Sequence, residues 1–229
     1  MPKTIQMHPT DMERLLRNIQ KILPHARLTA TRLPLCPEIK LLLLDPINMR
    51  RRFSPQEVRM ILSDPPFWSL CWASGQALAC HILQNPGLVK GKGVLDFGSG
   101  SGVAGLAAGM AGALKVLACD LDDDALDATR ANAMLNKIPV HTCRGIEEIS
   151  DALDLILAAD VLYDRENHHF LESFLTLAPT VMVADSRLKN LPMPAYRKIR
   201  EITLWTLPDL HESDEFNKVN IYLASSEGP

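Results

Sequence analysis

A short glycine-rich segment constrains the fold of this 229-residue chain more than any other stretch. The residues from Val94 to Phe97 are compatible with a β-strand, and Gly98, Gly100 and Gly102 follow them. Glycines let the backbone turn sharply and let a ligand approach main-chain N–H groups at a helix N-terminus. Apolar residues then recur at helical spacing, at Val103, Leu106, Ala107 and Met110. The segment therefore predicts a strand, a ligand-binding loop and a helix, as in sites for nucleotide-like ligands.

The charges beside this loop indicate which ligand it binds. Gly100, Gly102 and Gly105 also fit the G-x-G-x-x-G spacing of dinucleotide sites. Asp96, however, places a carboxylate at the end of the strand, which would repel a pyrophosphate and attract the ammonium and sulfonium groups of S-adenosylmethionine. Asp120 ends the next apolar run. Its separation from the glycine loop along the sequence is about that at which an acidic residue binds ribose hydroxyls in nucleotide-binding folds. We therefore expect S-adenosylmethionine as the cofactor, although Asp96 could be only a solvated loop residue and Asp120 only a helix N-cap.

Apolar runs alternate with helical patterns downstream of the loop, which is typical of a parallel α/β sheet. The run 153–159 is almost continuously apolar, as in a strand that is buried on both faces. We predict a Rossmann-like, doubly wound, mostly parallel seven-stranded α/β sheet within a domain at 64–229. The expected strands are 94–97, 115–120, 139–143, 153–159, 179–185, 199–206 and 217–223, with a helix at 122–136.

Residues 1–63 are predicted to form an N-terminal helical extension. This part carries most of the positive charge, since residues 1–60 hold 11 Lys and Arg against 5 Asp and Glu, while the whole chain has a net charge of −3. The surplus could recruit an acidic partner, or residues such as Arg14 could be only the solvated face of a helix. The expected elements are a helix at 10–23 begun by Thr10, irregular chain at 24–37, a short helix from Pro37 to Leu44, and a helix capped by Ser54.

Composition narrows the class of protein. The chain is 47% hydrophobic, and no apolar run has the length of a membrane span. No signal or transit peptide is expected, and five cysteines without C-x-x-C spacing predict reduced thiols in a cytoplasmic protein. The run Arg50-Arg51-Arg52 is too short to indicate nucleic-acid binding. His168 and His169 are adjacent in a helix, where side chains diverge, so no metal site is predicted.

A second carboxylate follows the apolar run 153–159, in the sequence Asp160-Val-Leu-Tyr163. Ligands of open parallel sheets bind beyond the carboxyl ends of the strands, where the strand order reverses. If strands 94–97 and 153–159 are neighbours there, Asp160 and Tyr163 face the methyl end of the cofactor. Asp160 could instead cap the next helix.

The segment before the glycine loop carries two aromatic features. Asp64-Pro-Pro-Phe67 resembles the amine-binding motif of DNA adenine and protein glutamine N-methyltransferases, but it lies too close to the loop for their topology. We predict a turn and a lid over the pocket. Trp72 either packs in the core or lies over the cofactor as an aromatic face.

Taken together, these motifs resemble those of class I, seven-stranded S-adenosylmethionine-dependent methyltransferases. More narrowly, they are similar to the lysine methyltransferases of the electron-transfer flavoprotein β subunit and their bacterial relatives. The resemblance spans roughly 33–190, and its narrower signals are Trp72-Ala-Ser-Gly-Gln-Ala-Leu78 and Asp160-x-x-Tyr163. One departure is Ala184-Asp-Ser-Arg-Leu188, where related enzymes often carry Gly-Asp-Pro-Gly-Arg.

The resemblance implies methylation of a lysine-bearing protein, with electron-transfer flavoprotein as a candidate partner and neither nucleic acid nor membrane involved. Asp160 and Tyr163 are then expected to hold the acceptor amine. The residues alone leave open a methyltransferase of small amines or other side chains, and a non-catalytic nucleotide-binding module. The predicted cofactor-binding residues are Trp72, Asp96, Gly98, Ser99, Gly100, Gly102, Asp120, Leu121, Ile146 and Ala159.

Overall fold

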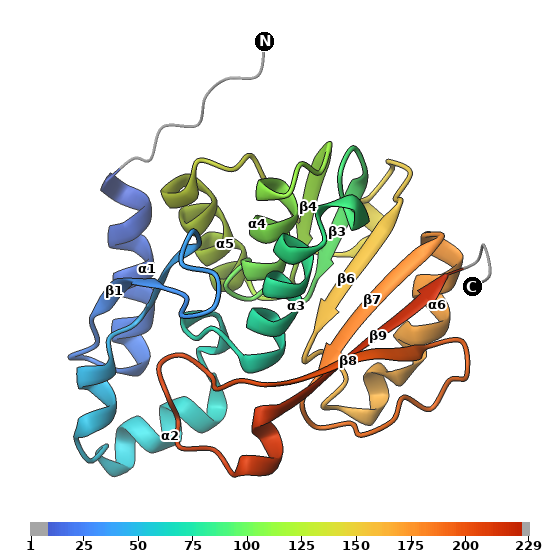
Figure 1. Cartoon of the computed structure of the whole chain (residues 1–229). Helices are drawn as coiled ribbons and strands as arrows, with labels where there is room; N and C mark the ends of the chain where they lie inside the picture. The colour runs from blue at the N-terminus through green and yellow to red at the C-terminus, as the bar shows by residue number, and fades with distance from the viewer. Residues whose placement is uncertain (1–8, 226–229) are drawn as a thin grey trace.

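The computed structural model describes residues 9–225 and is built on a seven-stranded sheet with the order β5-β4-β3-β6-β7-β9-β8 (Figure 1). The ladders that join β5, β4, β3, β6 and β7 are parallel, whereas β9 runs antiparallel to both β7 and β8. The predicted fold class is therefore confirmed. The strands are β3 (Gly93–Phe97), β4 (Lys115–Cys119), β5 (His141–Cys143), β6 (Leu155–Ala159), β7 (Thr180–Asp185), β8 (Arg197–Thr203) and β9 (Lys218–Ser225).

Helices cover both faces of this sheet, because its central strands are apolar on both sides. Val94 and Leu155 pack on one face in a cluster with α3 and α4, whereas Leu95 and Ile156 pack on the other face with Phe174 of α6. This alternation of neighbouring residues is what a doubly wound sheet requires. The helices that follow the N-terminal part are α3 (Ala73–Gln84), α4 (Val103–Met110), α5 (Asp123–Asn136) and α6 (Phe170–Leu177). None of the helices in the described part of the chain is long and apolar enough to cross a bilayer.

Short 3-10 helices connect these elements. They are η1 (Pro46–Arg50), η2 (Phe67–Ser69), η3 (Pro86–Leu88), η4 (Ile146–Glu148), η5 (Arg165–His169) and η6 (Asp214–Asn217). Two of them matter for the site, since η2 follows the Asp64-Pro-Pro segment and η5 follows Tyr163.

Two of the predicted N-terminal helices are present. α1 (Pro9–Ile22) matches the expected helix at 10–23, although the side chain of Thr10 lies outside what the structure describes. α2 (Pro55–Ser63) begins with a capping box, in which the Ser54 hydroxyl accepts from the N–H of Glu57 at 3.2 Å and the Glu57 carboxylate accepts from the N–H of Ser54 at 2.8 Å. α2 begins and ends where the local sequence predicts, whereas α1 begins at Pro9, so Thr10 lies inside the helix and is not its N-cap.

The segment between these helices is a β-hairpin, so the irregular chain expected at 24–37 and the helix expected from Pro37 to Leu44 are both wrong. β1 (Leu28–Arg32) pairs antiparallel with β2 (Lys40–Leu44). Side chains of α5 act as the partner on the free edge of β2. The N–H of Leu42 donates to Oδ1 of Asn132 at 2.7 Å, and Asn136 bonds both the N–H and the C=O of Lys40. Tertiary contacts therefore override the helical tendency of the leucine run.

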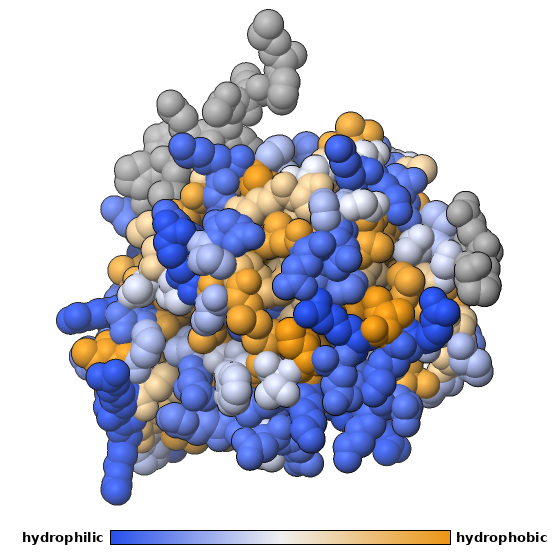
Figure 2. Space-filling view, in the orientation of Figure 1, coloured by the Kyte–Doolittle hydropathy of each residue, from blue (hydrophilic) through white to orange (hydrophobic). Residues whose placement is uncertain are grey.

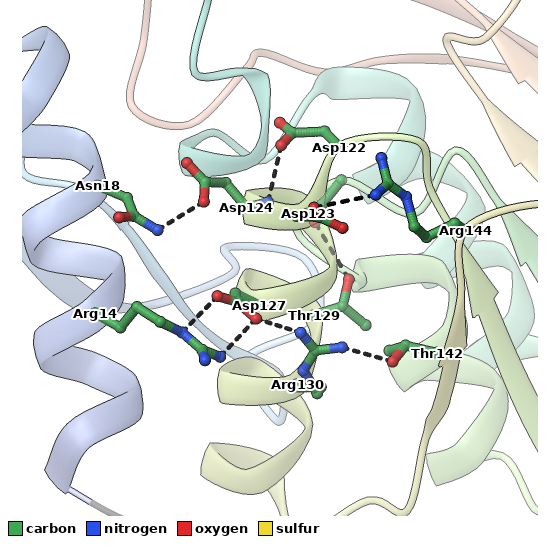
Figure 3. A network of polar contacts seen from close by, with 11 residues as sticks. Arg14, Asn18, Asp122, Asp123, Asp124, Asp127, Thr129, Arg130, Thr142 and Arg144 are labelled. Carbon is green, nitrogen blue, oxygen red and sulfur yellow. Dashed lines mark hydrogen bonds and ion pairs between the residues drawn. The ribbon is translucent and has the colours of Figure 1, made fainter.

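The first helix belongs to the core. Leu15 and Ile19 of α1 are buried in one cluster with the small residues on the facing side of α5. Figure 3 shows Arg14 and Asn18 of α1 pointing at carboxylates of α5, and the distances are 2.6 Å from Arg14 to Asp127 and 2.6 Å from Asn18 to Asp124. Arg14 is 46% exposed, as the solvated-face interpretation expects, and its ion pair also joins α1 to α5.

Two of the five cysteines are not reduced, in contrast to the prediction. Cys36 and Cys80 form a disulfide that joins the loop before β2 to α3, across a sequence separation of 44. Cys71, Cys119 and Cys143 are buried free thiols, as expected for core cysteines.

Candidate functional site

The candidate site lies where the strand order reverses. β3 has β4 on one side and β6 on the other, and Phe97 pairs with Ala158 in the parallel β3–β6 ladder. The sequence predicts that Asp160 reaches the ligand only if strands 94–97 and 153–159 are neighbours, and they are. Ligands of open α/β sheets bind beyond the carboxyl ends of the strands at such a point. A cavity of about 740 Å³ opens there. Nine of the predicted site residues line it: Trp72, Gly98, Gly100, Asp120, Leu121, Ile146, Ala159, Asp160 and Tyr163.

The glycine loop has the shape that its sequence predicts. Gly98 has a φ of +67°, and a Cβ there would lie 2.5 Å from Cγ1 of Val161. Gly102 has a φ of +79° at the N-terminus of α4, and a Cβ would lie 3.0 Å from the side chain of Thr129. Both positions require glycine for their backbone angle and for their space. The loop can therefore pass close beneath a ligand.

Asp96 is not placed as a ligand contact. It is 2% exposed and lies under the loop rather than in the cavity wall, and its Oδ2 accepts from the N–H of Gly105 at 2.8 Å. The solvated-loop alternative is wrong as well. Burial raises the pKa of Asp96 to about 7, with a smaller contribution from the charge of Asp120, and the Gly105 hydrogen bond opposes the shift. This carboxyl holds the first turn of α4 against β3.

Asp120 lines the cavity and organises the loop that borders it. One carboxylate oxygen accepts from the N–H of Gly100 at 2.9 Å and the other accepts from the N–H of Asp122 at 3.1 Å. Burial raises the pKa of Asp120 above its usual value. The N-cap of α5 is Asp122, whose side chain accepts from the N–H of Asp124, so the helix-cap interpretation of Asp120 is wrong.

Two further predicted cofactor residues support the loop from below rather than line the cavity. The Ser99 hydroxyl lies 3.1 Å from the Thr129 hydroxyl, and Gly102 packs against the same threonine. Thr129 is a buried residue of α5 and also donates to the C=O of Gly100 at 3.2 Å. Ser99 and Gly102 therefore shape the loop through Thr129, a residue that the sequence alone did not single out.

Asp160 occupies an unusual backbone position at the end of β6. Its φ is +52°, in the left-handed region, and its N–H donates to the C=O of Ala184 at 3.0 Å. Burial raises the pKa of Asp160 to about 6, with a smaller contribution from the charge of Asp185. It does not cap the next helix, because Asp164 accepts from the N–H of Glu166 and is the N-cap of η5.

The Asp160 carboxylate is held through one oxygen only. Oδ1 accepts from the Ser74 hydroxyl at 2.7 Å, from the Ser186 hydroxyl at 3.1 Å and from the Ser186 N–H at 3.3 Å. Within the described residues no hydrogen bond is made by Oδ2, and Asp160 lines the cavity. One oxygen of a fixed carboxylate is thus available to a ligand.

Aromatic side chains surround the outer part of the cavity. The ring of Phe67 lies 5.6 Å from Trp72 in an edge contact and 6.3 Å from Tyr163, measured between centroids. The Trp72 indole N–H donates to the C=O of Phe67 at 3.2 Å. Phe67 is 46% exposed and Tyr163 61%, so both reach the solvent at the mouth. Phe67 of the Asp64-Pro-Pro-Phe67 segment lines the cavity, and the role of the segment as a lid stays a prediction.

The two serines at Asp160 were missed by the sequence analysis. Ser74 lies within the quoted Trp72–Leu78 motif, and Ser186 lies within the stretch that departs from related enzymes, so both positions carried a signal without an assigned role. Their convergence on one carboxylate oxygen depends on the N-terminus of α3 and the C-terminus of β7 meeting at the same edge of the sheet, which only the fold reveals.

Comparisons with known proteins agree with this geometry. The family model "Ribosomal protein L11 methyltransferase (PrmA)" matches residues 77–164. The electron transfer flavoprotein beta subunit lysine methyltransferase of Mus musculus is 35% identical over 184 residues, which is 76% of this chain and 71% of the relative. The protein of the same name from Xenopus laevis is 33% identical over 204 residues, covering 85% of this chain and 81% of the relative. A solved magnesium protoporphyrin IX methyltransferase from Synechocystis PCC 6803, with bound S-adenosylmethionine, superposes with a TM-score of 0.51 at 15% identity, covering 67% of this chain and 79% of that one.

Proposed function

Because this chain belongs to the electron transfer flavoprotein β subunit lysine methyltransferase family, we propose that it methylates lysine side chains of a protein, with the electron transfer flavoprotein β subunit as the candidate acceptor. Its class is an S-adenosylmethionine-dependent methyltransferase. The observation that carries the proposal for this chain is the fixed Asp160 carboxylate, which keeps one oxygen for a ligand at an aromatic-walled opening.

The cavity fits the cofactor. Its volume of about 740 Å³ lies within the range of small-molecule sites, and glycines lacking a Cβ form the side where α4 begins. Asp120 can accept from ribose hydroxyls, and Trp72 offers an aromatic face beside a cationic group. Bound S-adenosylmethionine supplies a methyl group on a sulfonium, which is already an activated leaving group, so transfer depends mainly on alignment.

Asp160 aligns the acceptor. A lysine amine has a reference pKa of about 10.4 and must be neutral to attack. Asp160, with a pKa of about 6, is a much weaker base than the amine and does not take up the lysine proton, which passes to the buffered bulk solution before the neutral amine reacts. The free Oδ2 then accepts an N–H of the neutral amine and directs its lone pair inward. Phe67 and Tyr163 border the opening through which the aliphatic part of a lysine would pass.

A protein acceptor suits the surroundings of the opening better than a small amine. Phe67 and Tyr163 reach the solvent there, and large aromatic side chains gain most when a partner covers them. Figure 2 shows one face of the molecule, on which apolar and hydrophilic side chains are interspersed.

The test is transfer of label from S-adenosylmethionine in a cell extract that contains electron transfer flavoprotein, with purified flavoprotein β subunit in a parallel reaction. We expect label in one protein band, on lysine, and its loss with Asp160→Asn while cofactor affinity is kept. In-line alignment can supply about 7–11 kcal/mol of a barrier, so the loss should span orders of magnitude. Label that enters only small molecules would replace the protein-lysine proposal with the small-amine alternative.

A further inference from the structure

Hydrogen bonds from two serines fix the orientation of the Asp160 carboxylate. A carboxylate at the end of a strand can rotate about χ2, and rotation would exchange its two oxygens at the cavity. Three donors converge on Oδ1 in this protein, from Ser74 and from the hydroxyl and N–H of Ser186. These donors come from two elements, since Ser74 is in the first turn of α3 and Ser186 follows β7. The carboxylate plane is therefore clamped from two directions.

We infer that Ser74 and Ser186 are positioning residues, which hold Oδ1 of Asp160 so that Oδ2 faces the acceptor amine. This inference rests on the proposed transfer to an amine. It also gives a physical reason for the serine at position 186, where related enzymes often carry proline. A proline would supply neither the N–H nor the hydroxyl that Oδ1 of Asp160 accepts from.

The segment that carries Ser186 is itself fixed. Oδ1 of Asp185 accepts from the N–H of Arg187 at 2.8 Å and from the N–H of Leu188 at 2.7 Å, which closes a turn just after β7. Ser74 is fully buried and cannot exchange its bond to Asp160 for water. Both donors are thus presented by rigid backbone, which is what a precise site requires.

The charge balance favours the same role. Burial raises the pKa of Asp160, and the neighbouring charge of Asp185 raises the cost of ionising Asp160 further. Hydrogen bonds to a carboxylate favour its charged form. The serines therefore help to keep Asp160 ionised, the form in which Oδ2 can only accept from the amine.

The test compares Ser74→Ala, Ser186→Ala and the double variant with the wild type, and uses Ser69→Ala as a matched control. Ser69 is also fully buried, and its hydroxyl donates to a C=O of Pro66 at 2.8 Å, away from Asp160. The readouts are kcat and KM for the protein acceptor, the Kd for S-adenosylmethionine by calorimetry, and the melting temperature. Ser186→Thr restores the hydroxyl and serves as the rescue.

We expect each single variant to lower kcat on the order of tenfold, the size of one lost hydrogen bond to a charged group, with the Kd for cofactor unchanged within twofold. The double variant should lose more, Ser186→Thr should recover most of the rate, and Ser69→Ala should keep it. If Ser74→Ala does not fold, Ser186→Ala decides alone, because Ser186 is only partly buried. A lowered melting temperature with wild-type kcat in Ser186→Ala would overturn the inference. Absence of transfer by the wild type to any amine would instead refute the proposed function.

Discussion

The buried carboxyl of Asp96 makes the stability of this protein depend on pH in a way that one substitution can isolate. Its pKa rises from 3.8 to about 7 on folding, because burial disfavours the charge. A carboxyl whose pKa is raised in the folded state contributes stability that is fully present below the unfolded pKa and is lost as pH rises through the folded pKa. The window here therefore runs from about pH 4 to about pH 7.

The size of the effect follows from the shift. Each pKa unit corresponds to about 1.4 kcal/mol, so the whole shift is worth about 4 kcal/mol, of which about 2.5 kcal/mol falls between pH 5 and pH 8. Asp96→Asn removes the titration but keeps an oxygen that can accept from the N–H of Gly105. Relative to the variant, the wild type should lose about 2.5 kcal/mol between these two pH values.

The assay is urea unfolding of both proteins at pH 5 and pH 8 without cofactor. Asp154→Asn is the matched control, since Asp154 also accepts from a backbone N–H, that of Gly93 at 2.7 Å, but is exposed. Its free energy of unfolding should follow that of the wild type. Parallel pH dependence in the wild type and Asp96→Asn, within about 0.5 kcal/mol, would refute the burial argument.

Three further outcomes test the cofactor end, the acceptor end and the disulfide. Asp120→Ala should raise the Kd for S-adenosylmethionine at least about tenfold by calorimetry, because a charged acceptor and the anchor of the loop are lost, and an unchanged Kd would place Asp120 outside the site. Leu62 is 78% exposed on α2, which precedes the Phe67 segment at the cavity mouth, and we expect it to contact a protein acceptor, so Leu62→Asp should raise KM severalfold. Leu114→Asp, at an 80% exposed position before β4, should not raise KM, and equal KM values for the two variants would show that α2 does not contact the acceptor. Replacing Cys36 and Cys80 by serine should lower the free energy of unfolding by about 4 kcal/mol for their separation of 44, and a reductant should then have no further effect in urea unfolding.

The central part of the fold could be predicted from the sequence because its signals are local. The runs 115–120 and 153–159 are mostly apolar, and both became parallel strands whose terminal carboxylates, Asp120 and Asp160, line the cavity. Alternation of strand and helix then restricts the topology to few forms. The position of Asp160 and Tyr163 at the cavity followed from this regularity.

The parts that could not be predicted depend on partners distant in sequence. The leucines of β2 have no period that separates strand from helix. The hydrogen-bond partners that fix β2 as a strand, the side chains of Asn132 and Asn136, lie about 90 residues downstream. The burial of Asp96 also depends on tertiary structure, because α4 packs over β3 and covers this carboxyl group. A carboxylate beside a glycine loop can serve a ligand or the loop itself, and in this protein it accepts from Gly105.

The sequence predicts that α1 belongs to a separate N-terminal extension, whereas its contacts make it part of the core. Whether α1 stabilises the cavity wall can therefore be tested. Ile19 is fully buried against α5, and the first turns of α5 line the cofactor cavity through Asp122 and Ala125. Ile19→Ala should therefore cost about 2–5 kcal/mol of stability, and deletion of residues 1–24 should weaken cofactor binding as well as folding. Arg17→Ala is the control on the same helix, since Arg17 is 62% exposed and makes one ion pair with Glu13 at 3.7 Å, and it should change stability by less than about 0.5 kcal/mol. A truncated protein with wild-type melting temperature and cofactor affinity would show that α1 is an independent recruitment arm, and that its burial against α5 does not stabilise the cavity wall.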